Sequence, residues 1–131
     1  MATLFTRIIN GEIPCYKVAE DEHYFAFLDI NPLAKGHTLV VPKVEDDYIF
    51  NLDDETYTGL MLFAKKVAKA QRLAIPCKRI GVAVLGMEVP HVHVHLVPMQ
   101  HEGDMNLANA KLHLPDDEMA AIAAAIAAKI D

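Results

Sequence analysis

Short hydrophobic runs bounded by polar residues, glycine or proline occupy the first third of the chain and predict β-strands there. Two such runs are Cys15–Ala19 and Tyr24–Leu28, and the polar stretch Glu20–Glu22 between them predicts a hairpin turn. A third run, His37–Val41, is followed by Pro42, which lacks the N–H that a continuing strand would need. The pattern therefore predicts three strands joined by short loops.

Longer segments carry hydrophobic residues at helical spacing. The first long helix is predicted to begin near Asp53, with acidic residues in its opening turn, and to end before Pro76. A second is predicted over about residues 115–130, with Pro115 in its first turn, and Phe5–Asn10 predicts one further helical turn. The stripes expected to be buried are Tyr57, Leu60, Met61, Ala64, Val67 and Ala68 in the first long helix, and Met119, Ile122, Ile126 and Ile130 in the second.

Two more strands are predicted after the first long helix, at Arg79–Leu85 and His91–Val97. Groups of strands interrupted by a helix, in place of strict strand–helix alternation, favour an α+β fold with an antiparallel sheet. No repeat, linker or shift in composition divides the chain. We therefore expect residues 1–131 to form one domain, of a size that can build its own hydrophobic core.

Composition narrows the possible partners. The 131 residues are 53% hydrophobic, and their formal net charge is −6. This acidic balance argues against a nucleic-acid partner, because neutralising phosphates requires clustered basic side chains. The longest basic cluster, Lys65, Lys66 and Lys69, is expected to be a solvated helix face. With two cysteines outside any Cys-x-x-Cys pair and no apolar run of membrane-spanning length, we expect a cytoplasmic protein that has no membrane contact.

The most informative segment is the strand predicted at His91–Val97. Alternate side chains of a strand share a face, so His91, His93 and His95 are expected on one side of the sheet. The apolar residues between them are then directed into the core. One histidine on an apolar strand is commonly structural, whereas three in register indicate a functional site.

Two chemistries use such a row of imidazoles. In the first, neutral imidazoles bind a metal ion such as zinc. Histidines two positions apart are about 6.6 Å apart along a strand, so a neighbouring pair could share an ion, with a further ligand from His37 or a carboxylate. In the second, one imidazole attacks phosphorus while its neighbours hydrogen-bond the phosphoryl oxygens. The spread of the three residues favours the second chemistry and leaves the first open.

The segment His91–His95, followed by Leu-Val-Pro, resembles the signature of the histidine-triad family of nucleotide hydrolases and transferases. Three upstream blocks, Phe5–Pro14, Phe25–Pro32 and Gly36–Lys43, resemble the family in the same order. The resemblance covers roughly residues 4–98. It implies a five-stranded antiparallel sheet with two helices, and a homodimer in which two such sheets form a ten-stranded one.

The resemblance also implies roles for individual residues. His93 would be the nucleophile that forms a nucleotidyl-histidine intermediate, and His95 would hydrogen-bond the α-phosphate. His91 would fix the geometry of His93, and His37 would lie near the leaving group. Asp29 would accept the ribose hydroxyls of a purine nucleotide. The remaining predicted substrate contacts are Phe5, Ile8, Phe27 and Ile30 around the base, and Gly86, Met87 and Glu88 near the phosphate.

The chain departs from the family pattern in two places. Many bacterial relatives carry an N-terminal Cys-x-x-Cys and a histidine after the third strand, which form a zinc site with the triad. Here the N-terminal segment is Ala2–Thr6 and Glu45 follows the third strand, so we expect neither a metal nor another cofactor. Met87 also stands where the family usually has glutamine. Because Met87 and Met99 offer no hydrogen-bond donor to a polyphosphate, we expect a preference of at least about tenfold for phosphoramidates.

The leading interpretation is a nucleotide phosphoramidate hydrolase or nucleotidyl transferase that releases a nucleoside monophosphate. One alternative is a nucleotide-binding or interaction protein of the same fold with little turnover. A dinucleoside polyphosphate hydrolase and a metallohydrolase are further alternatives. The complete triad favours an enzyme, whereas Met87 favours a binding protein.

Overall fold

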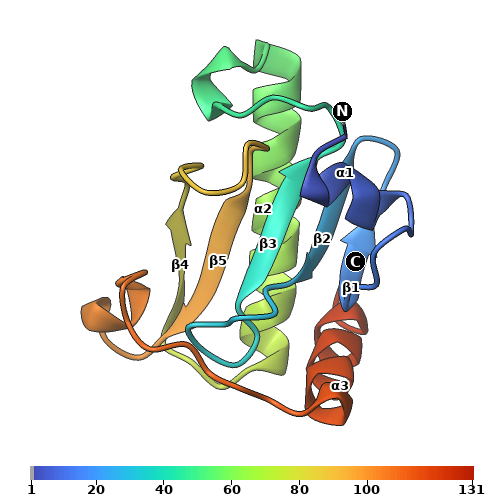
Figure 1. The fold of residues 1–131 in the computed structure, drawn as a ribbon. Helices are drawn as coiled ribbons and strands as arrows, with labels where there is room; N and C mark the ends of the chain where they lie inside the picture. The colour runs from blue at the N-terminus through green and yellow to red at the C-terminus, as the bar shows by residue number, and fades with distance from the viewer. Residues whose placement is uncertain (1) are drawn as a thin grey trace.

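A computed structural model describes residues 2–131, which form a five-stranded sheet, three α-helices and two short 3-10 turns (Figure 1). The sheet order is β1-β2-β3-β5-β4, and every neighbouring pair is antiparallel. The predicted α+β class is therefore confirmed. In chain order the elements are α1 (Leu4–Ile9), β1 (Lys17–Glu20), β2 (Tyr24–Leu28), β3 (Thr38–Pro42), η1 (Ile49–Asn51), α2 (Asp54–Ala74), β4 (Arg79–Ala83), β5 (Val94–Met99), η2 (Glu102–Met105) and α3 (Asp116–Ala127).

The two faces of the sheet carry separate hydrophobic clusters. Figure 1 shows α2 behind the sheet and α1 in front of it. The larger cluster joins α2 and α3 to the sheet and contains Val40, Val94 and Leu96. A smaller cluster on the α1 face contains Phe5, Ile8, Phe25, Phe27, Leu39 and Val41. Because His95 pairs with Leu39 of β3, its side chain lies on the α1 face, beside the smaller cluster.

The helices begin close to where the sequence predicts. The side chain of Asp53 caps α2 by accepting the N–H of Thr56 at 2.7 Å. Pro115 is the N-cap of α3, one position before the first turn in which we expected it. The prediction that Tyr57 is buried is wrong, because its side chain remains 37% exposed at the first turn of α2. None of the helices in the described residues is long and apolar enough to cross a membrane.

The predicted strand at His91–Val97 is shifted, since β5 begins only at Val94. The ladder between β3 and β5 ends at the pair Val40–Val94, and Pro42 has no N–H with which to extend it. The carbonyl of Pro42 instead lies 2.7 Å from Nε2 of His91, and Val92 donates its N–H to Asp46. His91 and His93 therefore lie in an extended segment that precedes the strand. The side chains still alternate, with the three histidines opposite the apolar residues.

Candidate active site

The ring of His93 has one nitrogen bound to the backbone and one nitrogen free. Its Nδ1 lies 2.8 Å from the carbonyl oxygen of His91. A carbonyl oxygen only accepts, so Nδ1 carries a proton, and in the neutral ring Nε2 holds the unshared electron pair. The Phe5 ring packs edge-on against His93, with centroids 5.1 Å apart, and restrains the imidazole further. The local backbone thus sets the tautomer that a nucleophilic imidazole needs.

His91 supplies that carbonyl and is itself held on both sides of its ring. Nε2 donates to the carbonyl of Pro42 at 2.7 Å, which leaves Nδ1 as an acceptor. The hydroxyl of Thr3, the N-cap of α1, lies 2.7 Å from Nδ1. The side chain is fully buried, and burial lowers the pKa of His91. A neutral, doubly bound His91 fixes the backbone from which His93 is oriented.

His37 and His95 form a second hydrogen-bonded pair, whose tautomers follow from a backbone amide. The N–H of Leu33 donates to Nδ1 of His37 at 3.0 Å, so Nε2 of His37 carries the proton. That Nε2 lies 3.1 Å from Nδ1 of His95 and donates to it. The remaining nitrogen of His95, Nε2, therefore also carries a proton. Burial lowers the pKa of both residues to about 4, and both are neutral at pH 7.

His37, His93 and His95 line a cavity of about 500 Å³ on the α1 face of the sheet. Asp29 contributes a carboxylate to its wall, and Oδ1 accepts the N–H of Asn31 at 2.9 Å. Oδ2 lies 3.7 Å from Nε2 of His37. Burial raises the pKa of Asp29. The full lining is Asp29, Asn31, His37, Leu85, Gly86, Met87, Glu88, His93, His95, Leu107 and Lys111.

The structure brings seven of the predicted site residues to this cavity: Asp29, His37, Gly86, Met87, Glu88, His93 and His95. His91 lies behind the wall and acts on it through His93. The residues predicted around the base do not line it. Phe5, Ile8 and Phe27 are buried in the smaller hydrophobic cluster, whereas the side chain of Ile30 is 68% exposed. Met99 is not part of the wall either, because it lies at the end of β5 beside Gly81.

The turn that precedes the triad forms one rim of the cavity. Gly86 has φ +74°, a left-handed conformation that a residue with Cβ adopts only with strain. Met87 is 89% exposed, and neither it nor Leu85 offers a side-chain hydrogen-bond donor. The donors available from this rim are therefore backbone N–H groups.

Sequence reasoning missed two further residues of the cavity wall, Leu107 and Lys111. Both lie in the irregular segment between η2 and α3, where no periodicity links them to the triad. The only available signal was a single lysine in a polar stretch. That signal is too common to single out a residue.

A metal site was the open alternative to imidazole chemistry. Nitrogen or oxygen atoms of Asp29, His37 and His95 lie within 4.8 Å of one another. A metal at Nε2 of His37 would move the proton of that ring to Nδ1, where it would face the N–H of Leu33. Two donors would then oppose each other in a buried place. The arrangement fits a chain of hydrogen bonds better than a metal site.

The N-terminal segment and the residues after β3 do not offer the ligands that a zinc ion needs. Thr3 and Thr6 have the spacing of a Cys-x-x-Cys pair, but hydroxyl groups do not replace thiolates as zinc ligands. Instead, Glu45 accepts the N–H of Thr3 and the hydroxyl of Thr6, each at 2.7 Å. Thr3 connects this cluster to His91. Hydrogen bonds therefore join the N-terminus to the triad.

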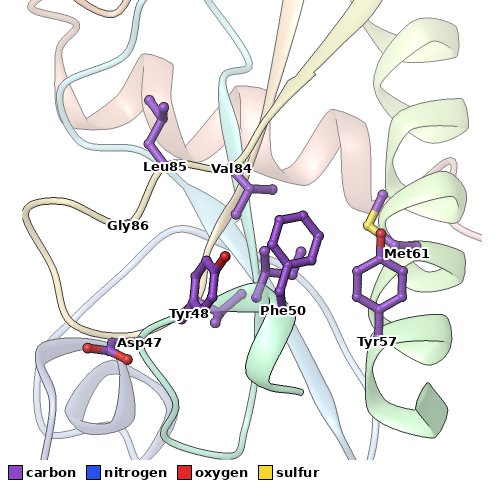
Figure 2. A pocket seen from close by; sticks show the side chains of 10 residues that line it. Asp47, Tyr48, Phe50, Tyr57, Met61, Val84, Leu85 and Gly86 are labelled. Atoms are coloured by element: carbon purple, nitrogen blue, oxygen red, sulfur yellow. The ribbon is translucent and has the colours of Figure 1, made fainter. Parts of the chain in front are cut away.

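A second hollow, of about 180 Å³, adjoins the cavity and shares Leu85 and Gly86 with it. Figure 2 shows the side chains of Tyr48, Phe50 and Tyr57 around this hollow, between η1 and the first turns of α2. Phe50 is 70% exposed and Tyr48 53% exposed. The hollow is thus an aromatic surface beside the triad, outside the row of histidines.

The fold and the site define a class of protein: an antiparallel α+β sheet that presents hydrogen-bonded histidines in a cavity. A family model for the HIT domain matches residues 10–102 of the chain. The chain belongs to the HIT domain family. The resemblance seen in the sequence is thereby confirmed.

Individual relatives agree with this assignment. The chain is 39% identical over 102 residues to the adenosine 5'-monophosphoramidase of Saccharomyces cerevisiae, a match that covers 77% of this chain and 65% of the yeast protein. It is 44% identical over 105 residues to an uncharacterized HIT-like protein of Methanocaldococcus jannaschii, covering 77% and 81% of the two chains. The crystal structure of a Hit-like protein from Bartonella henselae superposes with a TM-score of 0.83, at 30% identity, over 97% of this chain and 95% of that one.

Proposed function

We propose that the protein is a nucleotide phosphoramidate hydrolase or nucleotidyl transferase that uses His93 as a covalent nucleophile. The observation that carries the proposal is the hydrogen bond from Nδ1 of His93 to the carbonyl of His91 at 2.8 Å, which in the neutral ring places the unshared electron pair on Nε2. Supporting it, the name of the yeast relative describes a monophosphoramidase. The proposed substrate is a purine nucleotide joined through its α-phosphate to an amine.

The proposed reaction has two steps. In the first, Nε2 of His93 forms a bond to the α-phosphorus while the bond from phosphorus to the leaving nitrogen breaks. The departing amine takes one proton from solvent in the open cavity. In the second step, water attacks the phosphorus and the phosphorus–Nε2 bond breaks, which releases a nucleoside monophosphate, one proton and the free imidazole. An acceptor other than water would make the same chemistry a transfer.

The neighbouring residues have roles that fit their hydrogen bonds. Nε2 of His95 carries a proton and donates it in a hydrogen bond to an oxygen of the α-phosphate. This hydrogen bond stabilises the transition state most where negative charge develops on that oxygen. His37 holds His95 in that tautomer and lies toward the leaving group. Asp29, with the free lone pairs of its carboxylate, accepts the ribose hydroxyls. Backbone N–H groups at Gly86 and Met87 are the proposed partners of the remaining phosphate oxygens.

The base has a proposed place beside this cavity. Ile30, next to Asp29 in the chain, exposes 68% of its side chain and offers an apolar surface. Phe5, Ile8 and Phe27 would contribute through the smaller hydrophobic cluster in which they are buried. The proposed base site is shallow, because its aromatic side chains are already packed against one another.

We also propose a homodimer in which the β4 strands of two chains pair to form a ten-stranded sheet. β4 lies at the edge of the sheet and pairs only with β5 in the described part of the chain. Its free N–H and C=O groups would join a second copy. Val82 on this strand is 53% exposed, and the aromatic hollow of Figure 2 adds apolar surface near its end.

A comparison of variants tests the proposed nucleophile. Exchanging His93→Gly should lower kcat for an AMP–amine conjugate by several orders of magnitude while changing AMP affinity little. His23→Gly is the matched control, because His23 is exposed and lies at the β1–β2 turn. Comparable turnover in His93→Gly would refute the nucleophile. Tight AMP binding without turnover in the unaltered protein would favour the alternative of a nucleotide-binding protein.

A further inference from the structure

One lysine supplies the positive charge in the cavity that His37, His93 and His95 line. Lys111 is the only lysine or arginine among the described residues that lines this cavity. Asp29 and Glu88 are the carboxyl groups of the same wall. His37 and His95, with pKa values of about 4, supply no positive charge at pH 7. A phosphate that enters this cavity in an acidic protein therefore meets a single permanent cation.

The ammonium group of Lys111 is only partly satisfied by the protein. Its Nζ donates to the carbonyl oxygens of Leu107 and Asn109. An ammonium group has three N–H donors, so one remains for another acceptor. Within residues 2–131, no carboxylate forms an ion pair with Lys111. The free donor and the uncompensated charge lie on the cavity wall.

The chain holds this lysine in place. The N–H of Leu112 donates to the carbonyl of Pro32 at 2.8 Å, which ties the segment before α3 to the loop between β2 and β3. Figure 1 shows this segment crossing the lower end of the sheet on its way from η2 to α3. The side chain is half-buried. Lys111 also lies beyond residues 10–102, which match the HIT domain, so a different part of the chain contributes this cation to the site.

We propose that Lys111 binds phosphate oxygens of the bound nucleotide conjugate and extends the substrate class to conjugates with an anionic leaving group. The proposal rests on the function proposed above. Lys111 lines the same cavity as Asp29 and His37, and its neighbour Leu112 is bonded to Pro32, in the loop between β2 and β3 that carries both of these residues. In-line attack by His93 sends the leaving group away from the nucleophile, so a leaving phosphate needs a cation at a distance from His93. Lys111 meets that need, which Met87 cannot meet.

The test compares two substrates in three variants. In Lys111→Met, kcat/KM for a dinucleoside polyphosphate should fall at least about tenfold, while kcat/KM for an AMP–amine conjugate falls by less than about threefold. Lys111→Arg keeps the charge and should stay within about threefold for both substrates. Lys69→Met removes an exposed lysine of α2 and controls for the loss of one positive charge. Thermal unfolding of each variant shows whether the segment before α3 is still folded.

AMP affinity, measured by calorimetry, shows whether Lys111 binds the α-phosphate or a phosphate of the leaving group. This measurement does not require turnover. Unchanged AMP affinity in Lys111→Met, with the selective loss above, places Lys111 at the leaving group. Weaker AMP binding, with equal losses for both substrates, places it at the α-phosphate and still supports phosphate binding. If neither AMP affinity nor any kcat/KM differs from Lys69→Met, the proposal is wrong. An unaltered protein that binds AMP but turns over neither substrate would refute the proposed function and leave the binding test of Lys111 valid.

Discussion

The hydroxyl of Thr3 lies 2.7 Å from Nδ1 of His91, so the first turn of α1 is joined directly to the triad. The same hydroxyl accepts the N–H of Thr6 at 3.1 Å and caps the helix. His91 in turn orients His93 through its carbonyl oxygen. Residues 88 positions apart in the sequence therefore share one hydrogen-bonded unit.

This relationship predicts that Thr3→Val lowers kcat several-fold and destabilises the protein by about 1–3 kcal/mol, because Nδ1 of His91 and the helix cap both lose a partner. Thr3→Ser retains the hydroxyl and should restore both properties. Thr6→Val is the control, since it removes the bond to Glu45 but leaves the hydroxyl of Thr3 near His91. The readout specific to positioning is the ¹⁵N shift pattern of His91. An unchanged pattern and unchanged kcat in Thr3→Val would contradict the account.

The pair His37–His95 predicts how stability depends on pH. Both pKa values are lowered from 6.5 to about 4, so the unfolded state binds more protons than the folded state between these values. The two histidines therefore do not reduce the free energy of unfolding above about pH 6.5. As the pH drops toward 4, the free energy of unfolding falls, with a slope of up to about 2.7 kcal/mol per pH unit. Asp29, whose pKa is raised, reduces this slope near the acidic end.

Urea unfolding at several pH values between 7 and 4.5 measures this slope. His95→Gln removes one of the titrating groups and should reduce the slope by up to about 1.4 kcal/mol per pH unit, whereas the contribution of His91, whose pKa is also lowered, remains. A free energy of unfolding that stays flat down to pH 4.5 in the unaltered protein would mean that these histidines are not neutral in the folded state.

Gly86 predicts a sensitive position on the rim of the cavity. A Cβ at this residue would lie 3.1 Å from the carbonyl oxygen of Asp47, and φ is +74°. Gly86→Ala should therefore cost about 1–2 kcal/mol of stability and raise KM for the nucleotide substrate, because the backbone N–H groups of the turn shift. Gly103→Ala is the matched control, since nothing lies within 4 Å of a Cβ there and no positive φ is required. Equal KM values for the two variants would argue against phosphate binding by this turn.

The proposed pairing of two β4 edge strands predicts that a charge on β4 disrupts the dimer. Val82→Lys places a charge on β4 and should convert the proposed dimer into a monomer, as measured by sedimentation velocity. Leu73→Lys, at an exposed position near the end of α2, serves as a control for adding a charge to an apolar surface. A monomeric unaltered protein, or a dimer that persists in Val82→Lys, would contradict pairing through β4.

Much of this architecture could be predicted from local sequence patterns. The bounds of Tyr24–Leu28 match β2, and the alternation of histidine and valine placed the triad on one face. The start of β5 could not be predicted, because it depends on the bond between His91 and the carbonyl of Pro42, a contact between segments 49 residues apart. β4 ends at Ala83, two residues earlier than expected, because its ladder with β5 ends at the pair Ala83–His95.

The site was predictable only as far as its residues fall within a recognisable motif. His37 and Asp29 could be placed by resemblance, but the tautomers of His37 and His95 follow from the N–H of Leu33, which no pattern marks. Lys111 reaches the cavity because the segment before α3 returns to Pro32, a tertiary contact without a local signal. The exposure of Ile30 likewise reflects the course of the loop around it.

The central claim is that His93 becomes covalently bound to the nucleotide, and the most direct measurement is rapid acid-free quenching followed by mass spectrometry of peptides. After millisecond mixing with an AMP–amine conjugate, the account predicts an adenylyl group on the peptide that contains His93, attached to that imidazole. The adduct should be absent from His93→Gly and present in His23→Gly. Turnover of the substrate without any adduct at His93 would contradict the account, because water would then attack the phosphorus directly.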